Sequence, residues 1–405
     1  MPKQQRAPAN DAITELLTRG VAEVIEREHL EERLRRGDKL RVKFGIDPTA
    51  PDLHLGHLVP LRKLREFQDL GHTVVLIIGD YTATIGDPSG KDETRQQLSS
   101  DVVRANMTSY LDQARIVLDV DHAEIRYNSE WFERMTALDI AQLTSKVTVQ
   151  RVLERDDFKK RIAEDRDVSM LEAFYPLFQG YDSVMVRADV EIGGTDQKFN
   201  FLMGRKIQRR YDQQPQDVLT VPLLEGLDGT KKMGKSAQNY VGLREPEDGM
   251  YAKLMTIPDT LMRKYFDLVT NCSAADIDEA MRAENPRDAK MRLAREVVQR
   301  IHGAKAAEHA QAAFASLFQK HEVPEDVATK LLQQLRLRTP VPLTTILVRV
   351  GFASSSSDAR RLIKQGGVKI DGQPFRVADA IFNFKDYPNG ILIQKGKRHF
   401  IRVIA

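Results

Sequence analysis

A strand, a helix and a second strand follow one another within about forty residues near the start of this chain. Residues 40–46 are predicted as a strand, residues 58–70 as an amphipathic helix closed by Gly71, and residues 73–79 as the second strand. The second strand is almost entirely β-branched residues and leucine, which is typical of a strand buried on both faces. Such a unit requires parallel strands joined by a right-handed crossover. The sequence therefore predicts an α/β fold.

The alternation of strands and helices continues over the first 246 residues. Further strands are predicted at residues 124–127, 183–186 and 218–223. Helices are predicted at residues 12–36, 138–155, 158–165 and 197–210. We expect a Rossmann-like open parallel sheet with helices on both faces, which binds its ligands beyond the carboxyl ends of the strands.

The rest of the chain divides by composition. Residues 247–337 are charged and helically periodic, and the proline-rich stretch 339–342 marks a boundary. Residues 341–405 combine short helices with alternating strands such as 367–372 and 390–395. The net charge of +3 is the balance of +7 in this tail and −4 in the remainder. The small total charge excludes a wholly basic nucleic-acid binder, and the charge of the tail indicates that residues 341–405 form a small basic domain. The predicted domains are 1–246, 247–337 and 341–405.

Cysteine content and hydropathy point to the cytoplasm. The single cysteine, Cys272, excludes an intramolecular disulfide and a cysteine-rich metal site, and it fits a reducing compartment. Residues 1–11 are polar, and the strongest apolar run, residues 74–78, is far too short to span a bilayer. We expect a cytosolic protein with no membrane association.

The loop after the first strand carries a pair of histidines. His54 and His57 are three residues apart, so they share one face at the start of the predicted helix. Imidazoles and free backbone N–H groups at a helix N-terminus suit a phosphate. Gly56 lacks a Cβ and would admit a flat ligand such as adenine. The alternatives are two solvent-facing or metal-binding histidines, and a metal is disfavoured because no third ligand lies at suitable spacing.

A second loop, residues 223–236, is rich in lysine and glycine. It contains Lys231-Lys-Met-Gly-Lys-Ser236, and Lys232 and Lys235 could close on phosphates as charge moves to a leaving pyrophosphate. A solvated basic loop is the alternative, and for a lysine cluster alone it is the more frequent one.

Two glycine-rich segments fail the motifs that they resemble. Residues 85–91 have three residues between Gly86 and Gly90, and Asp92 stands where a Walker loop has Ser or Thr, so a P-loop is rejected. Residues 193–197 do not fit the Gly-x-Gly-x-x-Gly pattern, which disfavours NAD.

The His-x-Gly-His and Lys-Met-x-Lys-Ser motifs together are far more specific than either one. With both, the sequence resembles the class I aminoacyl-tRNA synthetases. The segments that narrow the resemblance to the bacterial tyrosyl-tRNA synthetases are residues 44–49, 85–90, Tyr175-x-x-x-Gln179-x-x-Asp182 and 193–197. The resemblance covers essentially the whole chain, because residues 341–405 are similar to the S4-type RNA-binding domain of many bacterial members.

The resemblance implies two steps: tyrosine and ATP form tyrosyl-adenylate and pyrophosphate, and the tyrosyl group then passes to the 3′-terminal adenosine of tRNA(Tyr). It places His54 and His57 at the phosphates and assigns Lys232 and Lys235 to the α-phosphate transition state. The other residues that it places around ATP are Asp47, Thr49, Gly56, Asp196 and Ser236. Mg²⁺ would arrive with ATP, held mostly by phosphates and water, and no protein metal site or tightly bound cofactor is expected.

For the amino acid, the resemblance assigns side chains to both ends of the substrate. Those at the α-ammonium and α-phosphate end are Asp87, Tyr175, Gln179 and Gln197. Asp182 would accept the phenolic hydroxyl, and a buried acceptor left unpaired by phenylalanine penalises that competitor. Lys43 aligns with a tyrosine that contacts this hydroxyl in some members; its ammonium could be the donor, or the contact could be absent.

The resemblance also implies RNA and protein partners. The tail residues that it assigns to RNA are Arg360, Arg361, Lys364 and Lys369, with Lys395, Lys397, Arg398 and Arg402 near the end of the chain. Residues 247–337 would lie on the anticodon side. Members are homodimers, and residues 131–153 are a candidate interface, although they could equally be core.

Two other functions stay open at this point. One is a relative specific for tryptophan, against which Asp182, Tyr175 and Gln179 argue. The other is an inactive RNA-binding or splicing-accessory homologue, against which the full set of histidines and lysines argues. The lysine motif departs from the usual pattern at Gly234, where serine is more common, and the glycine should loosen the loop.

Overall fold

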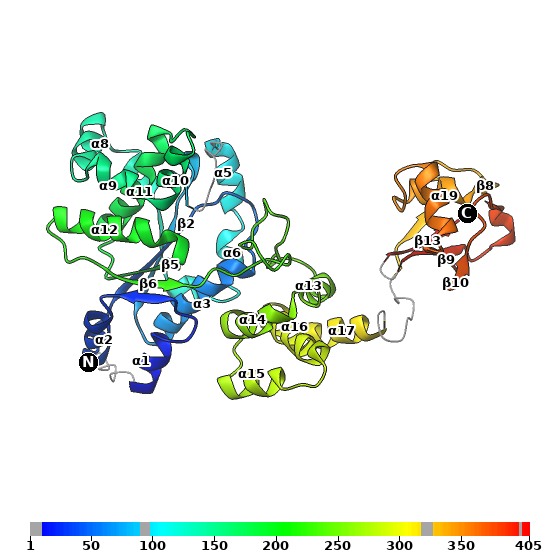
Figure 1. Ribbon diagram of the computed structural model, residues 1–405, viewed down its shortest axis with the longest axis horizontal. Helices are drawn as coiled ribbons and strands as arrows, with labels where there is room; N and C mark the ends of the chain where they lie inside the picture. Colours follow the sequence, from blue (N-terminus) through cyan, green and yellow to red (C-terminus); the bar gives the residue numbers. More distant parts are fainter. Residues whose placement is uncertain (1–9, 90–97, 317–326, 397–398) are drawn as a thin grey trace. The chain divides into compact units, whose positions relative to one another are not determined.

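The computed structural model describes residues 10–89, 98–316, 327–396 and 399–405 (Figure 1). Gly90, Lys91, Asp92, Lys397 and Arg398 therefore lie outside the described residues. The chain separates into two compact units, residues 1–304 and 305–405. The predicted domain boundaries at residues 246 and 341 stay predictions.

The first unit is built on a sheet with the strand order β1-β6-β5-β2-β3-β4. Its strands are β1 (Glu23–Ile25), β2 (Arg41–Ile46), β3 (Thr73–Ile78), β4 (Glu124–Tyr127), β5 (Val190–Gly194) and β6 (Asp217–Val221). β1 runs antiparallel to β6, and all other neighbours are parallel. The chain runs outward from β2 to β4 and returns as β5 on the other side of β2. The switch point between β2 and β5 is where such a sheet binds ligands, and the predicted Rossmann-like α/β class is confirmed.

Helices surround this sheet, with α2 and α3 on one side and α11 and α12 on the other (Figure 1). The helices before the last strand are α1 (Asn10–Leu16), α2 (Arg27–Arg36), α3 (Leu55–Asp69), α4 (Thr82–Ile85), α5 (Ser100–Met107), α6 (Tyr110–Ala114), α7 (Ser129–Phe132), α8 (Ala137–Thr144), α9 (Val149–Leu153), α10 (Asp156–Ala163), α11 (Met170–Met185) and α12 (Lys198–Arg210). β3 is buried along its length except at Thr73, as its composition predicts.

The single helix predicted at residues 12–36 is wrong. The chain forms α1 and α2 there, with the short strand β1 between them. Gly20 has φ +63° and Glu26 φ +64°, left-handed values that a helix interior does not contain. Val24 and Ile25 pair with β6, so pairing with an open sheet edge overrides the helical periodicity.

The strand predicted at residues 183–186 is also wrong, because residues up to Met185 belong to α11. A capping box starts this helix, in which Ser169 and Glu172 satisfy each other's backbone N–H groups. The strand that occupies this place in the sheet is β5, which includes Glu191. A buried charged residue concealed it from a hydrophobicity pattern.

Helices follow β6 in the first unit: α13 (Glu247–Leu254), α14 (Met262–Val269), α15 (Ala274–Met281) and α16 (Pro286–His302). α14 packs on α3, where Arg62 donates a 2.6 Å hydrogen bond to the carbonyl of Asp267. Tyr265 donates a 2.7 Å hydrogen bond to the carbonyl of Glu225, at the start of the lysine-rich loop. These helices therefore support both motif-bearing segments.

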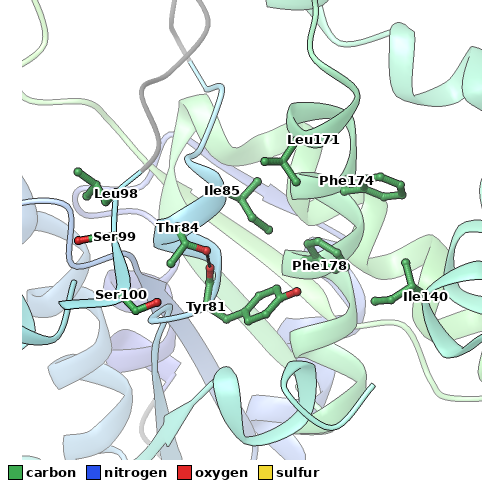
Figure 2. A pocket seen from close by; sticks show the side chains of 10 residues that line it. All are labelled: Tyr81, Thr84, Ile85, Leu98, Ser99, Ser100, Ile140, Leu171, Phe174 and Phe178. Carbon is green, nitrogen blue, oxygen red and sulfur yellow. Dashed lines mark hydrogen bonds between the residues drawn. The ribbon is translucent and has the colours of Figure 1, made fainter. Parts of the chain in front are cut away.

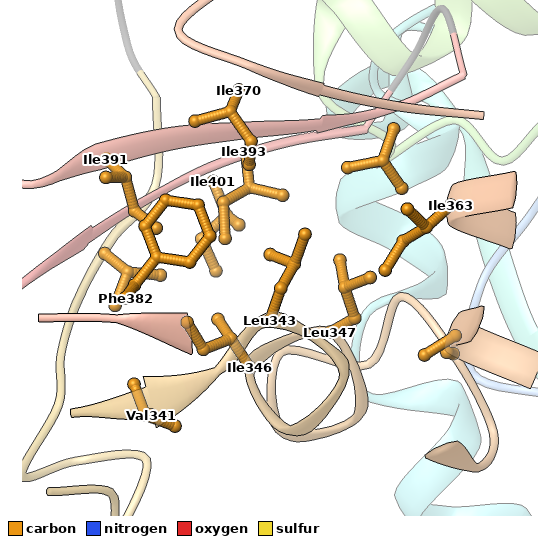
Figure 3. Packing of buried hydrophobic residues seen from close by; sticks show 14 of the residues in the cluster. Val341, Leu343, Ile346, Leu347, Ile363, Ile370, Phe382, Ile391, Ile393 and Ile401 are labelled. Atoms are coloured by element: carbon orange, nitrogen blue, oxygen red, sulfur yellow. The ribbon is translucent and has the colours of Figure 1, made fainter. Parts of the chain in front are cut away.

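The second unit contains a five-stranded sheet of order β10-β9-β12-β13-β7 and a small β11-β8 pair. Its elements are α17 (Ala304–Ala315), β7 (Thr329–Leu331), β8 (Val341–Pro342), α18 (Leu343–Arg349), α19 (Ser356–Lys364), β9 (Val368–Ile370), β10 (Gln373–Phe375), β11 (Ile381–Phe382), β12 (Ile391–Lys395) and β13 (His399–Ile404). α18 and α19 pack their apolar faces on the sheet, where Leu343, Leu347, Ile363 and Ile393 are fully buried (Figure 3). Residues 329–331, expected in the helical segment, form a strand that pairs with β13.

Candidate active site

The loops that leave β2 and β5 bring the first predicted residues to the switch point. Asp47 follows β2, and Asp196 follows β5. Gly79, after β3, leaves room for Asp47, because a Cβ there would lie 2.0 Å from the Asp47 carboxylate. Thr82 donates a 2.8 Å hydrogen bond to that carboxylate, so neighbouring strand ends hold it in place.

The two histidines start helix α3 and cap it reciprocally. The backbone N–H of Gly56 donates to Nδ1 of His54 over 3.1 Å, and the backbone N–H of His54 donates to Nδ1 of His57 over 3.2 Å. A Cβ on Gly56 would come within 2.9 Å of the His54 ring. The position of the His54 ring therefore itself favours a residue without a Cβ at position 56.

Both imidazoles are neutral hydrogen-bond donors rather than cations. Each Nδ1 accepts a backbone hydrogen bond, so each ring carries its proton on Nε2. Burial, reinforced by Lys232 and Lys235, lowers the pKa of His57 to about 4. Burial and the neighbouring His57 lower the pKa of His54 well below its usual value. The pair can donate two N–H groups to phosphate oxygens and adds no charge at neutral pH.

The segment that follows the lysine-rich loop pairs with the histidine loop. The N–H of Leu55 donates to the carbonyl of Val241 over 3.0 Å, and the N–H of Leu243 donates to the carbonyl of Leu53 over 2.9 Å. Met233, in the middle of the lysine motif, is 1% exposed. A buried methionine between Lys232 and Lys235 anchors the loop, so the structure brings the two motifs together.

The two lysines pair with carboxylates. Lys232 Nζ lies 2.5 Å from Oδ2 of Asp196, and Lys235 Nζ lies 3.4 Å from Oδ2 of Asp52. The Lys235 ammonium also stands over the ring of Tyr240, 5.7 Å from its centre. These side chains are 57% and 24% exposed, so both can exchange partners at little desolvation cost.

Gly234 is not required by its surroundings. A Cβ there would meet nothing nearer than the carbonyl of Lys232 at 3.9 Å. The loop is held instead by the buried Asn239, which sequence reasoning missed. Its side chain accepts from the N–H of Gly234 over 2.9 Å and donates to Asp228 over 2.9 Å.

Tyr175 links the loop after β2 to helix α11. Its hydroxyl donates a 2.9 Å hydrogen bond to Oδ2 of Asp47. Burial and the Asp47 charge raise the pKa of Tyr175 well above its usual value, so the phenol stays protonated. Asp47, which is predicted for ATP, thus contacts Tyr175, which is predicted for the amino acid.

Asp87, Gln179 and Gln197 are joined in one network. Gln197 Nε2 donates to Asp87 over 2.8 Å, and Asn200 Nδ2 donates to Oε1 of Gln179 over 2.8 Å and to Oε1 of Gln197 over 2.9 Å. Asn200 in turn accepts a 2.6 Å hydrogen bond from the buried Arg155. Asn200 and Arg155 were not predicted, and the chain offers no motif around them.

Arg155 also connects to Asp87 from the other side. Its Nη2 donates a 2.6 Å hydrogen bond to Oγ of Ser89, and Ser89 donates a 2.5 Å hydrogen bond to the Asp87 carboxylate. A carboxylate fixed by several donors is a preorganised acceptor for an ammonium group.

Asp182 is a buried carboxylate with two hydrogen-bond donors. Trp131 Nε1 donates to Oδ1 over 3.0 Å, and Asn128 Nδ2 lies 3.4 Å from Oδ2. Burial raises the pKa of Asp182 to about 7, while Lys43 and these donors oppose the shift. Tyr175, Gln179 and Asp182 follow one face of α11 at helical spacing.

Lys43 lies on β2 and is fully buried. Its Nζ donates to Oε1 of Glu191 over 2.8 Å, to Oγ of Ser183 over 2.8 Å and to the carbonyl of Gln179 over 3.0 Å. Glu191, only 1% exposed, was not predicted.

The remaining predicted residues lie nearer the surface. Thr49 is half-buried, its N–H donating to the carbonyl of Asp47 over 2.8 Å, and Ser236 is exposed.

In the second unit Arg360 and Arg361 on α19 pair with Asp379 and Asp358, respectively. Lys364 is exposed and Lys369, on β9, is half-buried.

Neither a metal-binding cluster nor a membrane-spanning helix is found among the described residues. No group of three or more His, Cys, Asp and Glu side chains in residues 10–89, 98–316, 327–396 and 399–405 is arranged to hold a metal ion. Over the same ranges no helix combines the length and hydrophobicity of a membrane span.

A cavity of about 640 Å³ lies on a different face of α11 (Figure 2). Leu171, Phe174 and Phe178 of α11 and Tyr81 beside α4 line its apolar part. None of the predicted site residues is among its lining residues, so this cavity is separate from the cluster at the strand ends.

The fold and the two joined loops are those of a nucleotide-binding α/β protein. Similarity to known proteins identifies the family within this class. A family model described as tRNA synthetases class I (W and Y) matches residues 35–319, and an S4 domain model matches residues 341–379. The tyrosine–tRNA ligase of Thermotoga maritima is 49% identical over 394 residues, 96% of each chain. That of Moorella thermoacetica is 47% identical over 397 residues, which are 96% of this chain and 94% of the relative.

A solved structure agrees with these matches. A C-terminally truncated mitochondrial tyrosyl-tRNA synthetase from Coccidioides posadasii superposes with a TM-score of 0.61 at 25% identity, over 75% of this chain and 90% of that one. The chain belongs to the class I tRNA synthetase family of tryptophan and tyrosine. It is therefore an enzyme, an aminoacyl-tRNA ligase with an S4 domain.

Proposed function

We propose that the chain activates tyrosine with ATP, forming tyrosyl-adenylate and pyrophosphate, and transfers the tyrosyl group to the 3′-terminal adenosine of tRNA(Tyr). The observation that carries the choice of amino acid is Asp182, a carboxylate buried on the same face of α11 as Tyr175 and Gln179. Such a group accepts a phenolic O–H, whereas an indole N–H would have to reach the same atom from a larger ring. Relatives named tyrosine–tRNA ligases at 47–49% identity support the same choice.

In the first step the tyrosine carboxylate attacks the α-phosphate in line, and pyrophosphate leaves. No protein nucleophile is needed, so the rate comes from positioning and charge stabilisation. His54 and His57 donate Nε2–H groups to phosphate oxygens. Lys232 and Lys235 supply positive charge. This charge stabilises the transition state more than the ground state, because negative charge moves to the leaving pyrophosphate.

The ion pair between Lys232 and Asp196 suggests how ATP could recruit the lysine. Asp196 is the residue assigned to the ribose, and it holds Lys232 at 2.5 Å. Ribose hydroxyls that donate to Asp196 would compete with the ammonium and release it toward the phosphates. Mg²⁺ enters as part of the Mg·ATP substrate, bound by phosphate oxygens and water, and the protein itself provides hydrogen bonds and ammonium groups.

At the other end, the amino acid is held by its ammonium and by its hydroxyl. Asp87, Tyr175 and Gln179 receive the ammonium, and Gln197 lies beside Asp87 at the α-phosphate end. Asp182 receives the hydroxyl. Tyr175 and Gln179 lie on the same helix, α11, as Asp182, so the ammonium and the hydroxyl of one amino acid can be bound from one helix face.

The proposal extends to tRNA, to a dimer and to the cytoplasm, where tRNA is charged in bacteria. The basic face of α19 suits an RNA backbone.

Homodimerisation is supported by large apolar side chains that stay exposed on α8, α9 and α11. These are Leu138 at 67%, Val149 at 73% and Met170 at 73% exposure. Within the predicted interface stretch, Trp131 and Phe132 instead belong to the core.

ATP–pyrophosphate exchange with each of the twenty amino acids tests the proposal. Tyrosine alone should support rapid exchange. Exchange with tryptophan instead would establish the tryptophan-specific alternative, and exchange with none would establish the inactive RNA-binding homologue.

A further inference from the structure

The buried pair of Lys43 and Glu191 lies directly beneath the tyrosine side of the site. Lys43 comes from β2 and Glu191 from the neighbouring strand β5, and their side chains are 0% and 1% exposed. A buried pair is costly to dehydrate, and removing one partner strands the other charge. The pair lies next to helix α11, and its contacts with that helix show what this cost maintains.

The ammonium of Lys43 has used all its hydrogen bonds. An ammonium donates three, and these go to Glu191, to the hydroxyl of Ser183 and to the carbonyl of Gln179. The last two acceptors lie on consecutive turns of α11 and bracket Asp182. Lys43 can donate to a substrate hydroxyl only by abandoning one of them.

The carboxylate of Glu191 is attached to the same helix. It accepts from the Ser183 hydroxyl at 3.3 Å and from Nε2 of Gln179 at 3.4 Å, and it also accepts from Gln216. Both members of the pair therefore hold the turn of α11 that presents Gln179 and Asp182 to the substrate.

The charges around Asp182 come from several elements. Lys43 and Asp47 face it from β2 and the loop after it, and Tyr175 faces it from its own helix. Asn128 and Trp131 are its neutral donors. Lys43 is the cation among these groups, and Glu191 neutralises it in part.

Resting on the proposed function, we propose that Lys43 and Glu191 are a charge-compensated positioning pair that holds the tyrosine-binding turn of α11, and that Lys43 is not a ligand of the substrate hydroxyl. Loss of Lys43 leaves Glu191 buried without its cation and lets the turn move. Loss of both charges is milder than loss of either one, because no charge is stranded.

The test compares K43M, E191Q and K43M/E191Q in tyrosine-dependent ATP–pyrophosphate exchange between pH 6 and pH 9. Each single variant should lose about tenfold or more in kcat/KM for tyrosine, and the double variant should recover at least threefold over K43M. In K43M the acid limb of kcat/KM should also move up by about one pH unit, because Asp182 loses a nearby cation. It should move back toward the wild-type position in the double variant.

K63M is the matched control. Lys63 is another buried lysine, 2.5 Å from Glu66 and 2.8 Å from the carbonyls of Leu16 and Arg19, on a part of α3 away from the amino-acid pocket. It should lower the melting temperature and leave the acid limb unmoved. If K43M is too unstable to assay, the comparison of E191Q with the double variant carries the same test.

Two results would overturn the proposal. One is a double variant no better than K43M. The other is a loss in K43M confined to discrimination between tyrosine and phenylalanine, which a direct ligand of the hydroxyl would produce. Failure of the proposed function is distinct, because the wild-type chain would then show no tyrosine-dependent exchange at all.

Discussion

The residues proposed for ATP and those proposed for tyrosine differ in their access to water and in their charge. Lys232 and Lys235 lie on a surface loop with side chains 57% and 24% exposed. On the tyrosine side, Lys43, Glu191 and Asp182 are all at most 4% exposed. The ATP side therefore carries its charges on solvent-accessible side chains that can exchange partners, and the tyrosine side fixes its charges inside the protein.

The two sides also differ in protonation. The histidines of the ATP side are held neutral, since the pKa of His57 is about 4. The carboxylate of Asp182 has a pKa of about 7 and changes charge near neutrality. A movable exposed charge suits a reaction in which negative charge shifts during the step, whereas a buried fixed charge suits discrimination between similar side chains. Substitutions and pH dependence test this difference.

K235A should have the largest effect, and only on the ATP side. Removing one donor aimed at transition-state charge costs about 10²–10³-fold in rate. Adenylate formation should slow by this factor while the affinity for tyrosine, measured by equilibrium dialysis, stays within about twofold.

K231A is the control for K235A, because its side chain is exposed on the same loop, and it should keep nearly full exchange activity. A weakened tyrosine affinity at unchanged rate in K235A would contradict the assignment of Lys235 to the phosphates.

D182N should have the next largest effect, and only on the tyrosine side. Exchanging a charged acceptor for an amide should lower kcat/KM for tyrosine about 10–100-fold in pyrophosphate exchange. KM for ATP should be unchanged.

The same substitution should alter the pH dependence of stability. The folded-state pKa of Asp182 is raised from 3.8 to about 7, so the folded state keeps a proton that the unfolded state has lost. Its contribution to stability falls as pH rises through this window. D182N should remove that fall, seen in melting temperatures from pH 4 to pH 8; a steeper fall in the variant would mean that Asp182 is stabilised as an anion.

Charge reversal on α19 should spare both sides of the site. In R360E/R361E/K364E, KM for tRNA in aminoacylation should rise about tenfold, and its dependence on salt should become less steep. Pyrophosphate exchange in the same preparation should match wild type. Equal loss in both assays would mean that the second unit acts in the activation step.

G234S should have the smallest effect. Space exists for a Cβ at this position, so exchange activity should change by less than about threefold. G56A is the contrasting glycine, because its Cβ would press on the ring of His54 at 2.9 Å. It should lose more than tenfold, and equal tolerance at both positions would refute the capping role of His54.

The sequence predicts the ATP side of the site better than the tyrosine side. His54, His57 and the lysine motif sit in short segments whose residue types and spacing suffice to find them. The βαβ unit and the tail strands at 368–370 and 391–395 are likewise local patterns, and the structure confirms them.

The tyrosine side depends on contacts between residues far apart in the sequence, which local sequence patterns do not reveal. β5 was misplaced because Glu191 interrupts its apolar run, and Glu191 is tolerated only because Lys43, 148 positions away, neutralises it. Arg155 and Asn200 meet through a fold that brings residues 45 positions apart together. The single helix predicted at residues 12–36 failed because β1 gains hydrogen bonds from β6, which lies far along the chain.

The pH dependence of kcat/KM for tyrosine and of KM for ATP, measured in one wild-type preparation, tests the central contrast most directly. Between pH 8 and pH 6, kcat/KM for tyrosine should fall about tenfold, because Asp182 with a pKa of about 7 becomes protonated and can no longer accept as a carboxylate. KM for ATP should stay constant over this range, because His57 with a pKa of about 4 stays neutral. The account would be contradicted if KM for ATP rose in parallel with the fall in kcat/KM for tyrosine, or rose before kcat/KM for tyrosine fell.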